Sequence, residues 1–187
     1  MERFLVDRAG AADAGHLPRA LEELLVVEEE DGLSLGLFLD DTLAAGAARG
    51  GLGQVAVLAE GVSHFVYLAT HAARGCPVSL LELEVQAEVD KFALLLLRGR
   101  AWRRSGRRRS RALRRLLYER IGFRADLEAD ELFRYRLANR LGAGYARWLE
   151  GRFVDGADDA GLLRELRQSY RLGAGEKLGH LASRAVH

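Results

Sequence analysis

The sequence has few of the residues that cross-link a chain or carry it through a membrane. Cys76 is the only cysteine, so the chain has no internal disulfide. No apolar run reaches the roughly 18 residues that a membrane span requires. Met1-Glu2-Arg3 leads into mixed polar sequence, which is not how a signal peptide begins. We therefore expect a cytoplasmic protein that does not act at a membrane.

Lysine is also scarce, so the positive charge of the chain is almost entirely guanidinium. Lys91 and Lys177 are the two lysines among 28 basic residues. The formal net charge is +1, yet residues 1–97 hold 6 Lys or Arg against 16 Asp or Glu, whereas residues 98–187 hold 22 against 11. The two halves attract each other. A contact within the chain or between copies therefore explains the asymmetry as well as an external polyanion does.

The N-terminal part has the pattern of a β-hairpin. Leucine occupies every second position from residue 33 to residue 39, which is the period of a half-buried strand. Asp31-Gly32 separates this run from an earlier apolar run, and Asp-Gly between two such runs is a strong hairpin signal. We predict strands over about residues 23–29 and 33–39.

Helical patterns follow the hairpin. Asp40-Asp41-Thr42 is a suitable cap for a short helix, Leu43–Arg49, which the cluster Gly50-Gly51-Leu52-Gly53 should end. Further helices are predicted over Leu58–Ala73, Ser79–Leu97, Arg111–Arg120, Ala129–Glu150 and Ala160–Leu172, and after Gly175. The fold class is therefore α+β and mostly helical, with an N-terminal β-hairpin, a central helix pair and a C-terminal helical extension.

The central helix pair carries ionisable groups in apolar surroundings. Glu60, His64 and His71 fall within an arc of about 40° on the first helix. Glu84 and Glu88 lie one turn apart on the apolar side of the second. Carboxylates in such a stripe are costly unless they are solvated, paired or bound to a metal. If the two faces meet, these residues form a metal site; otherwise the polar stripe of the first helix is its solvated side.

Two short motifs in this pair resemble a family of zinc enzymes. Leu58-Ala59-Glu60-Gly61-Val62-Ser63-His64-Phe65 resembles the Ala-His-Glu-x-x-His helix of gluzincin metallopeptidases, especially the small ImmA/IrrE-like ones. Ala87-Glu88-Val89-Asp90-Lys91-Phe92-Ala93 resembles the Glu-Ala-Asn-x-Phe-Ala helix that supplies their third zinc ligand. The resemblance covers about residues 23–98 and implies a zincin-like fold for them.

By this resemblance Glu60 matches the general base, His64 the second histidine ligand and Glu88 the carboxylate ligand. Ala59 stands where the first zinc-binding histidine would be. A zinc site needs at least three protein ligands, so His71 or Glu84 would have to supply another. We therefore predict a degenerate zincin-like protein with no cofactor. The alternative is a divergent zinc-dependent hydrolase, in which Glu60 accepts a proton from zinc-bound water.

An arginine-rich run follows the central pair. Ten arginines lie between Arg98 and Arg115 with no acidic residue among them, and Trp102 lies inside the run. Like charges at this density repel, so we expect residues 99–110 to form a mobile loop. It is either a solvated linker, a contact for the acidic half, or a site for the phosphates of a nucleic acid. The candidate polyanion-binding residues are Arg103, Arg104, Arg107, Arg108 and Arg109.

Two features near the C-terminus suggest no chemistry. Gly173-Ala174-Gly175-Glu176-Lys177 has the glycines and the lysine of a phosphate loop, but Leu178 stands where Ser or Thr would bind magnesium and no strand precedes it. His180 is expected to be exposed.

These patterns predict three segments and one main function. The segments are a zincin-like domain over residues 1–98, the arginine-rich loop over 99–110, and a helical extension over 111–187 packed on the first part. The main prediction is a non-catalytic binding or regulatory protein that acts through contacts with a protein partner or a second copy. The zinc-dependent hydrolase and the nucleic-acid binder are the alternatives.

Overall fold

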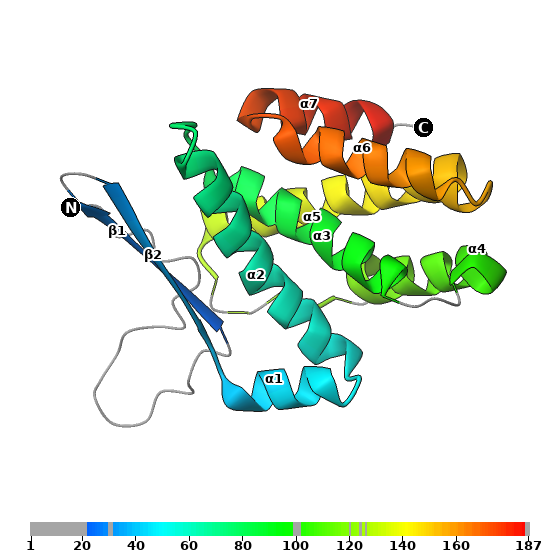
Figure 1. Ribbon diagram of the computed structural model, residues 1–187, viewed down its shortest axis with the longest axis horizontal. Helices are drawn as coiled ribbons and strands as arrows, with labels where there is room; N and C mark the ends of the chain where they lie inside the picture. The colour runs from blue at the N-terminus through cyan, green and yellow to red at the C-terminus, as the bar shows by residue number, and fades with distance from the viewer. Residues whose placement is uncertain are drawn as a thin grey trace. The chain divides into compact units, whose positions relative to one another are not determined.

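The computed structural model describes residues 22–29, 32–98, 102–119, 121–123, 125 and 127–185 (Figure 1). The fold is α+β and mostly helical, as the sequence predicts: a two-stranded antiparallel hairpin comes first and helices follow. The chain forms two compact units that divide between Pro77 and Val78. The boundary thus lies earlier than residue 98, because the second helix of the predicted central pair packs chiefly on a helix that follows it in the chain.

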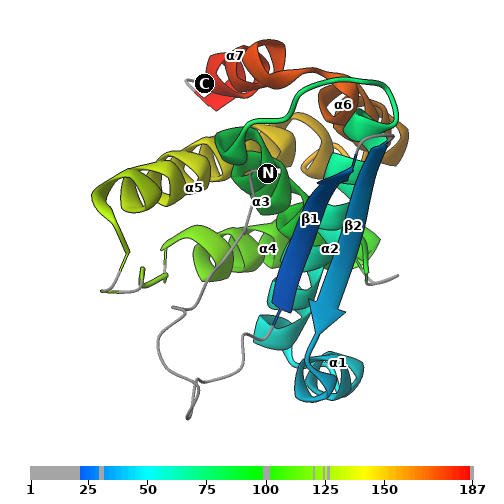
Figure 2. The same cartoon turned by 90° about the vertical axis from the view of Figure 1, so that its left-hand side faces the viewer.

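The hairpin of the first unit is the one predicted from the alternating leucines. Strand β1 (Glu22–Glu29) pairs with β2 (Gly32–Leu39) in an unbroken register, from Glu22 opposite Leu39 to Glu29 opposite Gly32. Leu24 and Val26 are buried on the face that packs against helix α2 (Figure 2). The strands meet α2 at Gly61, where a Cβ would overlap the carboxylate of Glu22. A side chain at residue 61 would therefore displace the carboxylate of Glu22.

Two helices complete the first unit. Helix α1 (Asp41–Ala48) begins as predicted, since the side chain of Asp40 accepts a hydrogen bond of 2.8 Å from the backbone N–H of Thr42. Gly50 has φ +90°, a conformation that favours glycine, and ends α1. Helix α2 (Leu52–Ala72) starts six residues before the predicted Leu58, because Gly53 lies in its exposed first turn and does not break it.

The length and hydropathy of α2 are those of a possible membrane span. Among the described helices, it alone meets this criterion. Core helices of soluble proteins meet the same criterion, so the observation is weak evidence for a span.

The regular elements described in the second unit are all helices. Its elements are α3 (Leu80–Leu97), α4 (Trp102–Arg114), the π-helical segment η1 (Arg115–Glu119), α5 (Ala129–Leu149), the π-helical segment η2 (Glu150–Val154), α6 (Asp159–Arg171) and α7 (Ala174–Ala185). Helices α3 and α5 pack closely at Gly142, where a Cβ would lie 2.8 Å from Cβ of Glu88. Phe92 and Tyr145 are among the largest fully buried side chains of this core. Figure 1 shows α6 and α7 running beside each other, and α7 packs on α5.

The predicted arginine-rich loop is a helix. Residues 99–101 lie outside the described part of the chain, but α4 runs without a break from Trp102 to Arg114. The prediction was wrong because it counted only the repulsion among the arginines. The acidic side chains that offset this repulsion come from residues 119, 150 and 155, which lie later in the chain.

Candidate functional site

The candidate metal ligands on α2 are buried imidazoles. His64 and His71 are almost inaccessible to solvent, so the alternative of a solvated polar stripe is wrong for these two residues. The ring of His71 lies with Nδ1 3.1 Å from the backbone oxygen of Tyr67, and the two ring centroids are 4.0 Å apart. Glu60, the candidate general base, is half-buried one turn before His64. Helix α2 therefore carries two buried imidazoles, about two helical turns apart.

The candidate carboxylate ligands on α3 both lie near cations of the second unit. Oε1 of Glu88 is 3.0 Å from Nζ of Lys91, and Oε1 of Glu84 is 3.9 Å from Nε of Arg134 on α5. The hydroxyl of Tyr118 donates to the backbone oxygen of Glu88 at 2.8 Å. Burial, and then the charge of Glu88, raise the pKa of Tyr118 well above its ordinary value. Each of these carboxylates thus lies within 4 Å of a positive charge.

The predicted metal ligands are divided between the two units. Glu60, His64 and His71 belong to the first unit, whereas Glu84 and Glu88 belong to the second. Within the part of the chain that is described, no group of three or more His, Cys, Asp or Glu side chains is arranged to hold a metal ion. The zinc site therefore stays a prediction.

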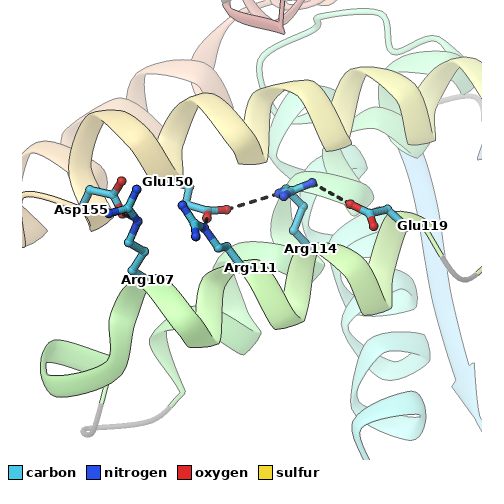
Figure 3. A network of polar contacts seen from close by, with 6 residues as sticks. All are labelled: Arg107, Arg111, Arg114, Glu119, Glu150 and Asp155. Carbon is cyan, nitrogen blue, oxygen red and sulfur yellow. Dashed lines mark hydrogen bonds and ion pairs between the residues drawn. The ribbon is translucent and has the colours of Figure 1, made fainter.

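One side of α4 is held by acidic residues of its own unit (Figure 3). Arg107, Arg111 and Arg114 recur at intervals of four and three residues, so they share one helix face. Nε of Arg111 and Nε of Arg114 lie 3.2 and 3.3 Å from the two carboxylate oxygens of the buried Glu150. We call this set the arginine ladder; its other contacts are Arg107 to Asp155 at 3.2 Å and Arg114 to Glu119 at 2.8 Å.

The remaining arginines of α4 are arranged differently. Arg108 and Arg115, at the start of η1, are exposed to solvent and lie about two helical turns apart. The guanidinium of Arg109 donates to the backbone oxygen of Leu95 at 3.0 Å, so Arg109 ties α4 to α3. The side chains of Arg103 and Arg104 lie outside the described residues. Of the five predicted polyanion-binding residues, Arg108 is therefore the one whose described side chain is exposed and carries no ladder contact.

A buried lysine was missed by sequence reasoning. Lys177 lies in the first turns of α7 and is fully buried, with its ammonium donating to Oε1 of Gln86 and lying 5.6 Å from the ring centre of Tyr170. Burial lowers the pKa of Lys177 to about 7, although the charges of Glu82 and Asp90 oppose this shift. The signal available in the sequence is the spacing of four residues between Lys177 and Leu181, which places both on one helix face. In the structure this face is the core side of α7, where Leu181 is buried.

A polar cluster around Glu165 was also missed. Oε1 of Glu165 accepts a hydrogen bond of 3.0 Å from the hydroxyl of Tyr145, and it lies 2.7 Å from Nε2 of His180 and 3.0 Å from Nε of Arg184. The guanidinium of Arg184 lies over the ring of Trp148 at 4.8 Å. Burial, and then the charge of Glu165, raise the pKa of Tyr145. The prediction that His180 is exposed was wrong, because this cluster joins α5, α6 and α7 around it.

Neither missed cluster is arranged for catalysis. The lysine is fully buried, so a substrate reaches its amine only if α7 moves. A nucleophile or a general base must come within hydrogen-bonding distance of the reacting atom. The Glu165 cluster is satisfied by donors from neighbouring helices. Both clusters therefore act in holding α7 to the rest of the second unit.

Comparison with known proteins adds no functional information. The sequence matches no family model, and no curated protein or solved structure is significantly similar to it. The function is therefore argued from the described residues themselves.

Proposed function

We propose that this protein is a non-catalytic binding protein whose helix α4 binds a nucleic acid through its exposed arginines. The observation that carries the proposal is that some arginines of this helix pair with acidic residues while others remain exposed. The arginine ladder attaches one face of α4 to η2, while Arg108 and Arg115 remain exposed beside that face. A helix with this density of positive charge is thereby folded before any ligand arrives.

Guanidinium groups suit this task for a physical reason. Each presents a planar fork of N–H donors that matches the oxygens of a phosphate, and it keeps its charge at every physiological pH. Ligands that bind an ordered surface avoid the entropy cost of ordering it. The side chains of Arg107 and Arg111 are still 61% and 51% exposed, so a phosphate can approach them beside Arg108 and Arg115.

The test measures how binding of a nucleic acid depends on salt. The probe is a fluorescently labelled single-stranded oligonucleotide of mixed sequence, whose anisotropy is followed on titration with the full chain at several NaCl concentrations. The logarithm of affinity should fall linearly with the logarithm of salt concentration, with a slope of about 0.7 per phosphate contact. The double variant Arg108→Ala/Arg115→Ala should bind more weakly, and its slope should be smaller by about 1.4.

A matched variant separates site binding from net charge. Arg164 and Arg167 on α6 are also exposed, so Arg164→Ala/Arg167→Ala removes the same charge from the same unit. This control should keep the wild-type slope. The proposal is wrong if both double variants lose affinity equally, if the wild type does not bind, or if it binds vesicles of anionic lipid and not the oligonucleotide.

A further inference from the structure

We propose that the hairpin of the first unit binds an extended, basic segment of a partner polypeptide as a third β-strand along the outer edge of β1. This inference concerns a different surface and a different ligand from the α4 proposal. It depends on three observations: an exposed apolar face, a strand edge that no described residue pairs with, and a one-sided charge.

The face of the hairpin turned away from α2 is apolar. Leu25, Val27 and Phe38 are 36%, 46% and 57% exposed, although their neighbours Leu24 and Val26 are buried. The register places Leu25 opposite Gly36, and a Cβ on Gly36 would lie 3.3 Å from the ring of Phe38. The ring therefore lies against the glycine, next to Leu25. Three large side chains thus form one exposed apolar surface on two paired strands.

The edge of β1 carries glutamates but lacks the other features that keep strand edges from pairing. Edge strands in proteins are commonly short, bulged, charged, or interrupted by proline. Strand β1 has eight residues, no proline, no lysine and no bulge in its register with β2. The sheet has two strands within the described ranges, so no described residue pairs with the outer edge of β1. Its backbone groups there have the geometry that another extended chain requires.

The negative charge of the hairpin and its flanking residues favours a basic partner segment. Residues 20–48 hold eight Asp or Glu and no Lys or Arg. Like charges on adjacent strands are destabilising, which disfavours a second copy of β1 as the partner strand. A strand that alternates basic and apolar side chains satisfies both requirements. Its apolar side chains lie beside Leu25 and Val27 of β1, and its positive charges meet Glu23.

The experiment uses the full chain and synthetic peptides. The probe is a labelled eight-residue peptide that alternates Val and Arg, with binding followed by fluorescence anisotropy and by amide hydrogen exchange of β1. We expect binding that slows exchange in β1 and fails for two control peptides, one with Glu in place of Arg and one with Pro at alternate positions. Proline removes the backbone donors that a strand needs, while the arginines of that peptide are unchanged.

Matched variants locate the binding surface. Phe38→Ser removes the ring that lies next to Leu25 and should weaken binding about threefold or more, whereas Phe133→Ser, which alters an exposed phenylalanine of the second unit, should leave it unchanged. Glu23 lies opposite Phe38, and Glu23→Gln keeps every apolar contact of the hairpin. It should weaken binding about two- to fivefold and reduce the salt dependence.

Several results would overturn the proposal. Equal binding of the proline peptide would mean simple charge attraction, and equal binding to wild type and Phe38→Ser would exclude the hairpin face. A change in the far-ultraviolet circular dichroism of Phe38→Ser would mean that this variant is misfolded. Glu23→Gln is then the deciding variant, and an unchanged affinity of Glu23→Gln for the peptide would overturn the proposal. A wild type that dimerises in sedimentation, with Phe38→Ser monomeric, would identify a second copy as the occupant instead.

Discussion

At the scale of single residues, Lys177 shows most clearly how the helices of the second unit constrain one another. A charged amine is costly to bury, and burial accordingly lowers the pKa of Lys177 to about 7. The carboxylates of Glu82 and Asp90 reduce this cost by attraction, and Gln86 accepts a hydrogen bond from the amine. Since Lys177 lies on α7 and the other three on α3, its protonation state influences how firmly α7 is held.

The lowered pKa predicts a stability that rises with pH. The unfolded chain keeps its proton on Lys177 up to about pH 10.4, whereas the folded chain releases it near pH 7. Between these values the unfolded state binds more protons, so the free energy of unfolding should increase by up to about 1.4 kcal/mol per pH unit. Above about pH 10 the raised pKa values of Tyr118 and Tyr145 act in the opposite sense, because the unfolded chain then loses protons that the folded chain retains.

The measurement is urea denaturation of wild type and Lys177→Met from pH 7 to pH 10. All other titrating groups are common to both proteins, so the difference between the two curves isolates Lys177. The difference should favour Lys177→Met at pH 7 and shrink as the pH rises. Parallel curves would mean that Lys177 titrates as an ordinary exposed lysine.

At the scale of elements, the arginine ladder explains why α4 is a helix. Glu150 lies at the junction of α5 and η2 and accepts from both Arg111 and Arg114 through its two carboxylate oxygens. It is buried, whereas Glu119 at the end of the ladder is exposed and contacts one arginine. The two glutamates therefore contribute unequally to the attachment of α4.

Neutralising Glu150 should loosen α4. Glu150→Gln leaves two guanidiniums without their charged acceptor and should lower the free energy of unfolding by about 1.5 to 3 kcal/mol, the range for hydrogen bonds to charged groups. Glu119→Gln, the matched control, should cost less than about 1 kcal/mol, as is typical of exposed ion pairs. The two values are compared by urea denaturation at one pH and one salt concentration. Equal losses would show that the ladder does not depend on Glu150.

The hairpin and α4 also show what the sequence can predict and what it cannot. The alternation from Leu33 to Leu39 is local, and the strands lie within one residue of the predicted limits. The charge repulsion among the arginines is local too, but its compensation by Glu150 and Asp155 joins residues 39 and 48 positions apart. Periodicity and capping patterns predict the secondary structure of residues that are close together in the chain. Pairing between distant side chains depends on helix packing, which the spacing of residues does not reveal.

The same limit applies to the candidate sites. Helix positions follow from local sequence, so the sequence correctly assigns Glu60, His64 and His71 to one helix. The burial of Lys177 depends on contacts with α3 and α6, which the sequence around Lys177 does not reveal.

At the scale of the whole molecule, the charges of the two units are opposite. Residues 1–77 hold 5 Lys or Arg against 12 Asp or Glu, and residues 78–187 hold 23 against 15. The two proposed ligands follow this division. The basic second unit offers arginines to phosphates, and the acidic first unit offers its hairpin to a basic strand. A zinc site differs from both, since its predicted ligands belong to both units.

Metal content therefore tests the zinc hypothesis at the level of the whole chain. We expect the purified protein to contain far less than one zinc per chain by elemental analysis. Only His64 and Glu88 match ligand positions of the gluzincin pattern, and Oε1 of Glu88 already lies 3.0 Å from the ammonium of Lys91. One equivalent of zinc in the wild type, lost in His64→Ala and kept in the control His180→Ala, would contradict this expectation. Glu60 would then be the first residue to test for hydrolase activity.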